Sequence, residues 1–148
     1  MQNHELSADQ VRDLRMLAGM MIPPSTVYDV PGADDERIFN DILRSLERDR
    51  DDIRHALSHL AAIGGCAFAD LEAQRRPEVA TAFREAGGAP LAALVRVVLL
   101  CYYRDDRVMR SLGQEARPPF PRGHVVEQGD WSLLDPVRAR LPMYRTVD

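Results

Sequence analysis

The first part of the chain alternates between apolar residues at helical spacing and breaks made of glycine or proline. The sequence Ser7-Ala8-Asp9-Gln10 is typical of a helix start, because the hydroxyl and the amide can each satisfy a free backbone N–H. Apolar residues at helical spacing follow until Pro23-Pro24 ends the pattern. The segment from Ser25 to Gly32 is too rich in turn-forming residues to be regular. We therefore predict one helix before the proline pair and an irregular segment after it.

A second, long helix is predicted from residues 33–35 to Gly64-Gly65. Acidic residues at its start favour the positive end of the helix dipole, and a glycine pair is a typical helix end. The face opposite the apolar stripe carries charges of both signs between Arg44 and Asp52, which is typical of a solvated helix face. The predicted apolar stripe consists of Ile38, Ile42, Leu46, Ile53, Leu57 and Leu60.

The most hydrophobic run of the sequence, Leu91 to Tyr103, follows Pro90. Its length and valine content fit a buried strand as well as a helix. Because no second strand candidate can pair with it, we predict a central, buried helix. Residues 68–75 and 77–86 are predicted to form one helix or two short ones before this run, and Arg107 to Leu112 a short helix after it.

From residue 116 onward the helical period disappears, and closely spaced prolines, glycines and the only tryptophan take its place. Proline restricts the backbone and lowers the entropy cost of an extended conformation. The sequence therefore predicts a single all-α domain, in which residues 1–115 form a small helical bundle and residues 116–148 an extended, irregular Pro/Gly-rich C-terminal arm. The large apolar side chains of this arm must pack either on its own bundle or on a partner, and composition alone slightly favours the bundle.

Charge and composition argue against nucleic acid and membranes as partners. The net charge is −4 and all 19 basic residues are arginines, so no global field attracts nucleic acid or an anionic membrane. No stretch of about 20 apolar residues occurs, which predicts that the chain does not span a membrane. The first residues lack the basic and apolar regions of a signal peptide. We therefore expect a cytoplasmic protein, with export to the periplasm on a signal-bearing partner as the alternative.

Few residues have a spacing suited to catalysis or metal binding. His55 and His59 lie one helical turn apart, which could place two imidazoles on one face as metal ligands. The zinc-protease pattern needs a glutamate where Ala56 stands, and no third ligand has a suitable spacing, so we interpret both as surface or packing histidines. Cys66 and Cys101 are predicted to be buried free thiols. No nucleophile elbow is present, and we assign no catalytic, cofactor-binding or metal-binding residue to the chain.

The most distinctive pattern lies between Leu100 and Val137. Residues 102–113 read YY-x-D-x-x-V-x-x-x-L-G, residues 119–123 read P-F-P-x-G, and residues 129–137 read GDWSLLDPV. These segments, together with an Ile-Pro-Pro turn at residues 22–24, resemble the gluconate 2-dehydrogenase subunit 3 family. The resemblance covers most of the chain and is sharp between Leu100 and about Val137.

Members of that family are small helical subunits of FAD-dependent, GMC-type dehydrogenases that oxidise a sugar, glycoside or other alcohol. The resemblance implies a non-catalytic small subunit that binds and stabilises a large flavoprotein dehydrogenase subunit in a hetero-oligomer, with FAD in that partner and no cofactor in this chain. It also shifts the expected role of the arm toward partner binding. The predicted partner-binding residues are Phe120, Pro121, His124, Trp131, Leu133, Leu134, Arg138, Arg140, Met143 and Tyr144.

Two alternatives remain open from the sequence. The first is a transient folding or export chaperone for the same dehydrogenase, which would leave the mature enzyme. The second is a stand-alone enzyme whose site combines His55, His59 and nearby carboxylates, and which would require a concave pocket around perturbed ionisable groups.

Overall fold

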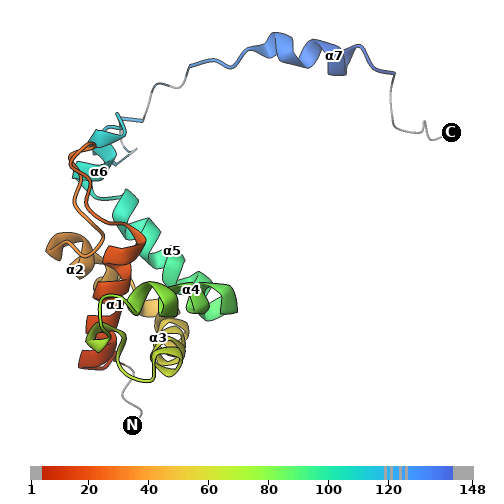
Figure 1. Ribbon diagram of the computed structural model, residues 1–148. Helices are drawn as coiled ribbons and strands as arrows, with labels where there is room; N and C mark the ends of the chain where they lie inside the picture. The colour runs from red at the N-terminus through yellow and green to blue at the C-terminus, as the bar shows by residue number, and fades with distance from the viewer. Residues whose placement is uncertain (1–4, 119, 121, 124, 126, 142–148) are drawn as a thin grey trace. The chain divides into compact units, whose positions relative to one another are not determined.

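The computed structural model describes residues 5–118, 120, 122–123, 125 and 127–141 (Figure 1). The chain divides into two compact units, Met1–Ala116 and Arg117–Asp148. The described residues form α-helices and short 3₁₀ turns, and the only β-type pairing among them is an isolated bridge between Ser25 and Val30. The predicted all-α fold is confirmed.

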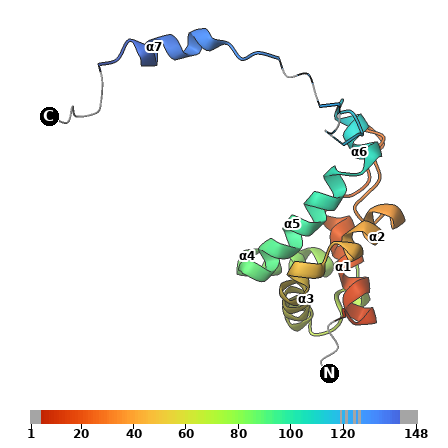
Figure 2. The same cartoon turned by 180° about the vertical axis from the view of Figure 1, so that it is seen from behind.

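The helices in the described part of the first unit pack around one hydrophobic core. α3 and α5 make the most extensive helix–helix contact, α1 and α4 pack on α3, and α2 packs on α5 (Figures 1 and 2). The helices are α1 (Ala8–Met21), α2 (Glu36–Arg44), α3 (Arg50–Gly64), α4 (Arg76–Ala86), α5 (Ala89–Tyr103) and α6 (Asp106–Ser111), with 3₁₀ turns η1 (Glu47–Asp49) and η2 (Phe68–Asp70).

The first helix begins as the sequence predicts. The Gln10 backbone N–H donates to the Ser7 hydroxyl at 3.2 Å, and the Ser7 N–H donates to the Gln10 side-chain oxygen at 3.1 Å. These two bonds satisfy N–H groups that a helix start leaves without partners. α1 also holds the loop that contains η2, because the buried carboxylate of Asp13 accepts the Ala69 N–H at 2.8 Å.

The long helix predicted up to Gly64 is wrong, because the chain breaks between α2 and α3. The apolar stripe has a gap of two helical turns between Leu46 and Ile53, and a continuous helix would need an apolar residue where Asp49 stands. The Asp49 carboxylate is instead ion paired with Arg96 of α5 at 2.8 Å. The short turn η1 ends at Asp49, so this side chain can reach Arg96 while Leu46 and Ile53 on either side of the turn remain buried in the core.

α4 and α5 are separated by two glycines with positive φ, Gly87 at 63° and Gly88 at 99°. Side chains other than hydrogen are disfavoured in this region, and the two helices are bent by 115° at the break. Pro77 and Pro90 lie in the first turns of α4 and α5. Between α3 and α4 only the 3₁₀ turn η2 is helical. The structure therefore has neither a single helix over residues 68–86 nor a helix over residues 68–75, and the helix predicted for residues 77–86 is α4.

α5 is a helix, as predicted, but it is buried on one face only. The buried face comprises Ala93, Leu94, Val97, Val98, Cys101 and Tyr102. The other face leaves Leu99, Leu100 and Tyr103 exposed by 38%, 59% and 53%. The prediction of a central, buried helix therefore holds for one face of α5 only, because the other helices of the bundle leave Leu99, Leu100 and Tyr103 uncovered.

The two cysteines differ in environment. Cys101 is buried, as predicted, whereas Cys66 is exposed. α3 ends at Gly64, and Gly65 has a φ of 78°, so Cys66 lies in the loop beyond the helix rather than in an apolar helical context. Burial raises the pKa of the Cys101 thiol, which favours its neutral form.

The starts of α2 and α6 are joined by the guanidinium of Arg107. Its nitrogens donate to the Asp35 carboxylate at 2.7 and 3.2 Å and to the Asp105 carboxylate at 2.9 and 3.1 Å. Asp35 caps α2, and Asp105 caps α6. One side chain therefore fixes the relative positions of two helix starts that are 70 residues apart (105 − 35 = 70) in the sequence.

This contact also determines the titration of both carboxyl groups. The hydrogen bond from Arg107 lowers the pKa of Asp35 below its ordinary value of 3.8. Burial raises the pKa of Asp105, but the hydrogen bonds from Arg107 outweigh it, and the pKa of Asp105 also falls below 3.8. Lowered carboxyl pKa values stabilise the fold at neutral pH, and this stabilisation is lost as the pH falls below 3.8.

We expect the substitution Arg107→Gln to lower the free energy of unfolding by about 2–3 kcal/mol, because it leaves the buried Asp105 charge without its main partner. The control is Arg110→Gln, which removes only an exposed ion pair with Asp106 at 3.5 Å and should cost less than about 0.5 kcal/mol. Urea unfolding followed by circular dichroism measures both. Equal losses in the two variants would contradict the role given to Arg107.

The difference in unfolding free energy between the wild type and Arg107→Gln should depend on pH. At pH 7 both carboxylates are ionised in both proteins, and the difference should be largest. In the variant, burial without Arg107 raises the pKa of Asp105, so this group takes up a proton at a higher pH than in the wild type and the difference should begin to shrink above pH 3.8. As the pH falls below 3.8, Asp35 and Asp105 of the wild type take up protons and lose the interaction that the variant already lacks, so the difference should shrink further. Urea unfolding at pH 7, 5, 4 and 3 tests this, and a difference that stays constant to pH 3 would argue against it.

Candidate docking surfaces

The segment from Tyr102 to Gly113, which carries the sharpest sequence pattern, forms the corner between α5 and α6. The Tyr102 hydroxyl donates to the Pro31 carbonyl at 3.2 Å, and the buried Asp105 caps α6 by accepting the Arg107 N–H at 2.9 Å. Val108 belongs to the core. Gly113, with a φ of 72°, follows the end of α6. Tyr102, Asp105, Val108 and Gly113 are therefore the four positions of the pattern that have a structural role in this corner.

The remaining two positions of the pattern, Tyr103 and Leu112, are more than half exposed. Tyr103 lies edge-on to Tyr102, with ring centroids 5.2 Å apart, but most of its ring area faces solvent. Exposed large apolar side chains that neighbouring residues leave uncovered are typical of protein contact surfaces when they gather in patches. These two positions are therefore candidates for contacts outside the bundle.

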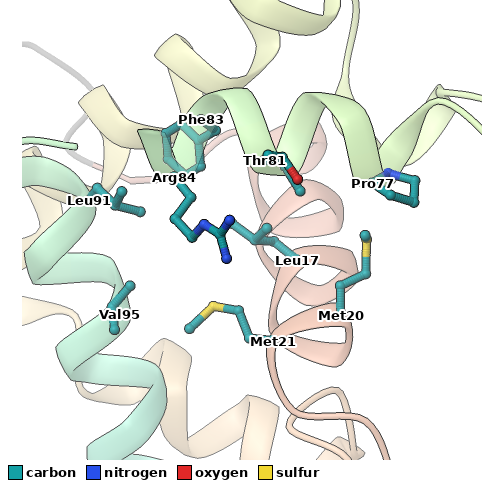
Figure 3. A pocket seen from close by; sticks show the side chains of 10 residues that line it. Leu17, Met20, Met21, Pro77, Thr81, Phe83, Arg84, Leu91 and Val95 are labelled. Atoms are coloured by element: carbon teal, nitrogen blue, oxygen red, sulfur yellow. The ribbon is translucent and has the colours of Figure 1, made fainter. Parts of the chain in front are cut away.

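An apolar groove of about 510 Å³ lies between α1, α4 and α5. Its residues are Leu17, Met20, Met21, Pro77, Ala80, Thr81, Phe83, Arg84, Leu91 and Val95. Figure 3 shows the Arg84 side chain reaching from α4 across the groove, with its guanidinium between Leu17 and Met21 of α1 and Val95 of α5. The groove thus combines apolar walls with one cation. Methionines adapt to different partner shapes because their side chains are unbranched and flexible.

A second hollow continues along α5 beyond this groove. Its residues are Ala92, Val95, Arg96, Leu99, Leu100 and Tyr103. Val95 lines both hollows, so they adjoin along α5, and we call the two together the α5 surface. It ends at Tyr103, one of the two exposed positions of the sequence pattern.

The arm contains a short helical segment, which the sequence analysis did not predict. The 3₁₀ turn η3 (Trp131–Leu134) leads into α7 (Asp135–Arg138). The Asp130 carboxylate caps this segment by accepting the Ser132 N–H at 3.0 Å and the Ser132 hydroxyl at 2.6 Å. The cap and a proline in the first turn of α7 are local signals of a helix start. A segment of two turns is too short to show an apolar period.

The helical segment of the arm leaves its apolar side chains uncovered. Trp131, Leu133 and Leu134 are exposed by 63%, 74% and 40%. The Trp131 indole N–H donates to the Gln128 side chain at 3.1 Å, which orients the ring. Phe120, Arg138 and Arg140 are also exposed. The other predicted contact residues, Pro121, His124, Met143 and Tyr144, lie outside the described residues.

The histidine pair of the stand-alone enzyme hypothesis lies on the surface of α3. His55 and His59 are both exposed, and the His59 ring lies edge-on to Phe83 of α4 at 6.0 Å. His59 therefore packs between helices, in agreement with the interpretation as surface or packing histidines. Among the described residues, no group of three or more His, Cys, Asp or Glu residues could hold a metal ion.

The α5 surface does not follow from the sequence pattern. Its residues lie within runs that a buried helix would also contain, and an apolar run without a period does not reveal which face is covered. One signal was available. Apart from Arg96, the run from Leu91 to Tyr103 is apolar on all sides of a helix, whereas the rest of a chain of this length offers few helices to surround it.

A membrane-spanning helix is not found in the described part of the chain. No single helix there is both long and apolar enough to cross a bilayer. α4 and α5 would meet the requirement only as a bent pair, by length and composition.

The chain was compared with models of protein families, with curated protein sequences and with solved structures, and no match was found in any of the three.

The capped segment of the arm gives a direct prediction. Asp130→Ala should reduce the helical population of residues 131–138, because an N-cap contributes about 1 kcal/mol to a short helix. Backbone carbon chemical shifts of the full-length chain measure this population. The exposed Glu127→Ala substitution is the control and should leave the shifts of residues 131–138 unchanged. If both variants behave alike, the cap does not hold the segment.

Proposed function

We propose that this chain is the non-catalytic small subunit of a dehydrogenase complex, and that it binds and stabilises a large, FAD-dependent GMC-type subunit that oxidises a sugar, glycoside or other alcohol. The observation that carries the proposal is the helical segment of the arm, which is capped by Asp130 and in which Gln128 orients the Trp131 ring, while Trp131, Leu133 and Leu134 remain exposed. The resemblance between Leu100 and Val137 suggests which class of partner covers them.

The proposed mechanism is stabilisation by binding. A chain that binds the folded large subunit and not its unfolded form stabilises it by RT ln(1 + [L]/Kd), or about 2.7 kcal/mol at a concentration of 100 Kd. A segment that is already capped and oriented loses less conformational entropy on binding than an unstructured one. Large aromatic anchors such as Trp131 contribute a major share of the energy in many protein interfaces.

Co-expression with a GMC-type flavoprotein dehydrogenase from the same organism tests the proposal, and a gene of that class adjacent to the gene of this chain would be the first choice. We expect the large subunit to be soluble and to retain FAD only when the chain is present, and the two to elute as a stoichiometric complex. A mature, active dehydrogenase that requires the chain for folding but elutes without it would identify a chaperone. A dehydrogenase that is equally soluble, stable and active without the chain would refute the proposal.

The arm contributes to this binding through two residues of its helical segment. In the full-length chain, the double substitution of Trp131 and Leu134 by alanine should raise the Kd for the large subunit at least about 30-fold, corresponding to a loss of about 2 kcal/mol. Val125→Ala, at a fully exposed arm position outside the helical segment, should change the Kd less than about twofold. Dilution of each co-expressed complex, followed by mass photometry, measures the Kd of all three proteins, and unchanged affinity of the double variant would exclude the helical segment from the interface.

A further inference from the structure

The α5 surface carries two arginines, of which one is ion paired and the other is not. Arg96 is ion paired with Asp49 at 2.8 Å. Arg84 makes no ion pair or hydrogen bond with any residue in the described ranges of the chain, although its guanidinium lies across the groove (Figure 3). The surface therefore presents one uncompensated positive charge within apolar walls.

A partner that covers this surface removes both arginines from water, and the free-energy cost differs between the two. Covering the Arg96 pair removes two opposite charges from water together, and each remains compensated by the other. Covering Arg84 with an apolar partner would remove a single cation from water, which costs several kcal/mol. A carboxylate placed against Arg84 removes this cost and can form two parallel hydrogen bonds with the guanidinium. The charge distribution thus favours a partner with one acidic group.

The shape of the surface favours a helix. The surface follows α5 from Leu91 to Tyr103, which is about 18 Å at 1.5 Å per residue. A partner helix of about 12 residues has the same length, and its apolar residues at three- and four-residue spacing would meet a linear apolar surface. The uncompensated charge of Arg84 lies toward the Leu91 end, so the acidic residue belongs near one end of that helix.

We propose that the α5 surface binds an amphipathic helix of about three turns from the large subunit, and that an aspartate or glutamate near one end of this helix pairs with Arg84. This inference rests on the proposed function, since it takes the large subunit as the partner. It adds a second contact region, in the bundle, which involves residues different from those of the arm.

The test compares two arginines in the full-length chain bound to the large subunit. Arg84 and Arg44 each lie in the last turn of a helix, both are exposed, and neither is ion paired within the described residues. A charge reversal therefore disturbs the helix dipole similarly at both sites. We expect Arg84→Glu to raise the Kd at least about 30-fold, because it places two carboxylates in contact. Arg44→Glu should change the Kd less than about threefold.

Photo-crosslinking identifies the partner segment. A benzophenone amino acid at Leu99 should link to one peptide of the large subunit, and this peptide should be an amphipathic helix with an acidic residue near one end. The same amino acid at Arg48, which is exposed and lies outside the α5 surface, should give no link to that peptide. Replacing the identified acidic residue by arginine should restore the binding of Arg84→Glu.

The outcomes separate the two proposals. If the wild-type chain forms no complex with the large subunit, the proposed function fails and this inference fails with it. If the complex forms but Arg84→Glu binds as tightly as Arg44→Glu, and Leu99 gives no crosslink, only this inference is overturned. If Arg84→Glu instead dissociates a homodimer of the chain, measured by light scattering without the large subunit, the α5 surface binds a second copy and the inference is equally overturned.

Discussion

The arrangement of the bundle depends on the guanidinium of Arg107. It holds two carboxylates, each of which begins a helix, and one of them, Asp105, has a side chain only 4% exposed. An ionised carboxylate at that depth is stable only with a partner of opposite charge. Because Asp35 and Asp105 share one cation, α6 must stay beside the start of α2. The corner after α5 is therefore fixed by charge as well as by packing.

This corner determines which side of α5 is covered. The Tyr102 hydroxyl is bonded to the Pro31 carbonyl, and Arg104 is paired with Asp41 of α2 at 2.6 Å. Both contacts draw α2 against one side of α5, while α3 covers the adjoining side. On the remaining side, α1 and α4 line only a groove beside Leu91 and Val95, and Leu99, Leu100 and Tyr103 stay exposed. The 15-residue helix α5, which contains the apolar run from Leu91 to Tyr103, thus acquires a core face and an uncovered face from the same set of contacts.

The elements that could be predicted from the sequence are those determined by neighbouring residues. The capping box at Ser7, the prolines in first turns and the glycine stops each act over three or four positions, and the structure has them. The break at Asp49 could not be found in this way, since it depends on an arginine in α5, 47 residues away (96 − 49 = 47). The exposed face of α5 and the loop position of Cys66 likewise depend on where other helices end or pack.

The two candidate docking surfaces require different features of a partner. The segment from Trp131 to Arg138 is a short helical element with exposed apolar side chains, which require a pocket on the partner, and its cap at Asp130 reduces the entropy cost of entering one. The α5 surface is a groove that requires a helix with a charge. Since both belong to one chain, binding at one raises the effective concentration of the other near the same partner. Two contacts of modest affinity, one at each surface, would then suffice for a stable complex. Neither contact requires a catalytic residue.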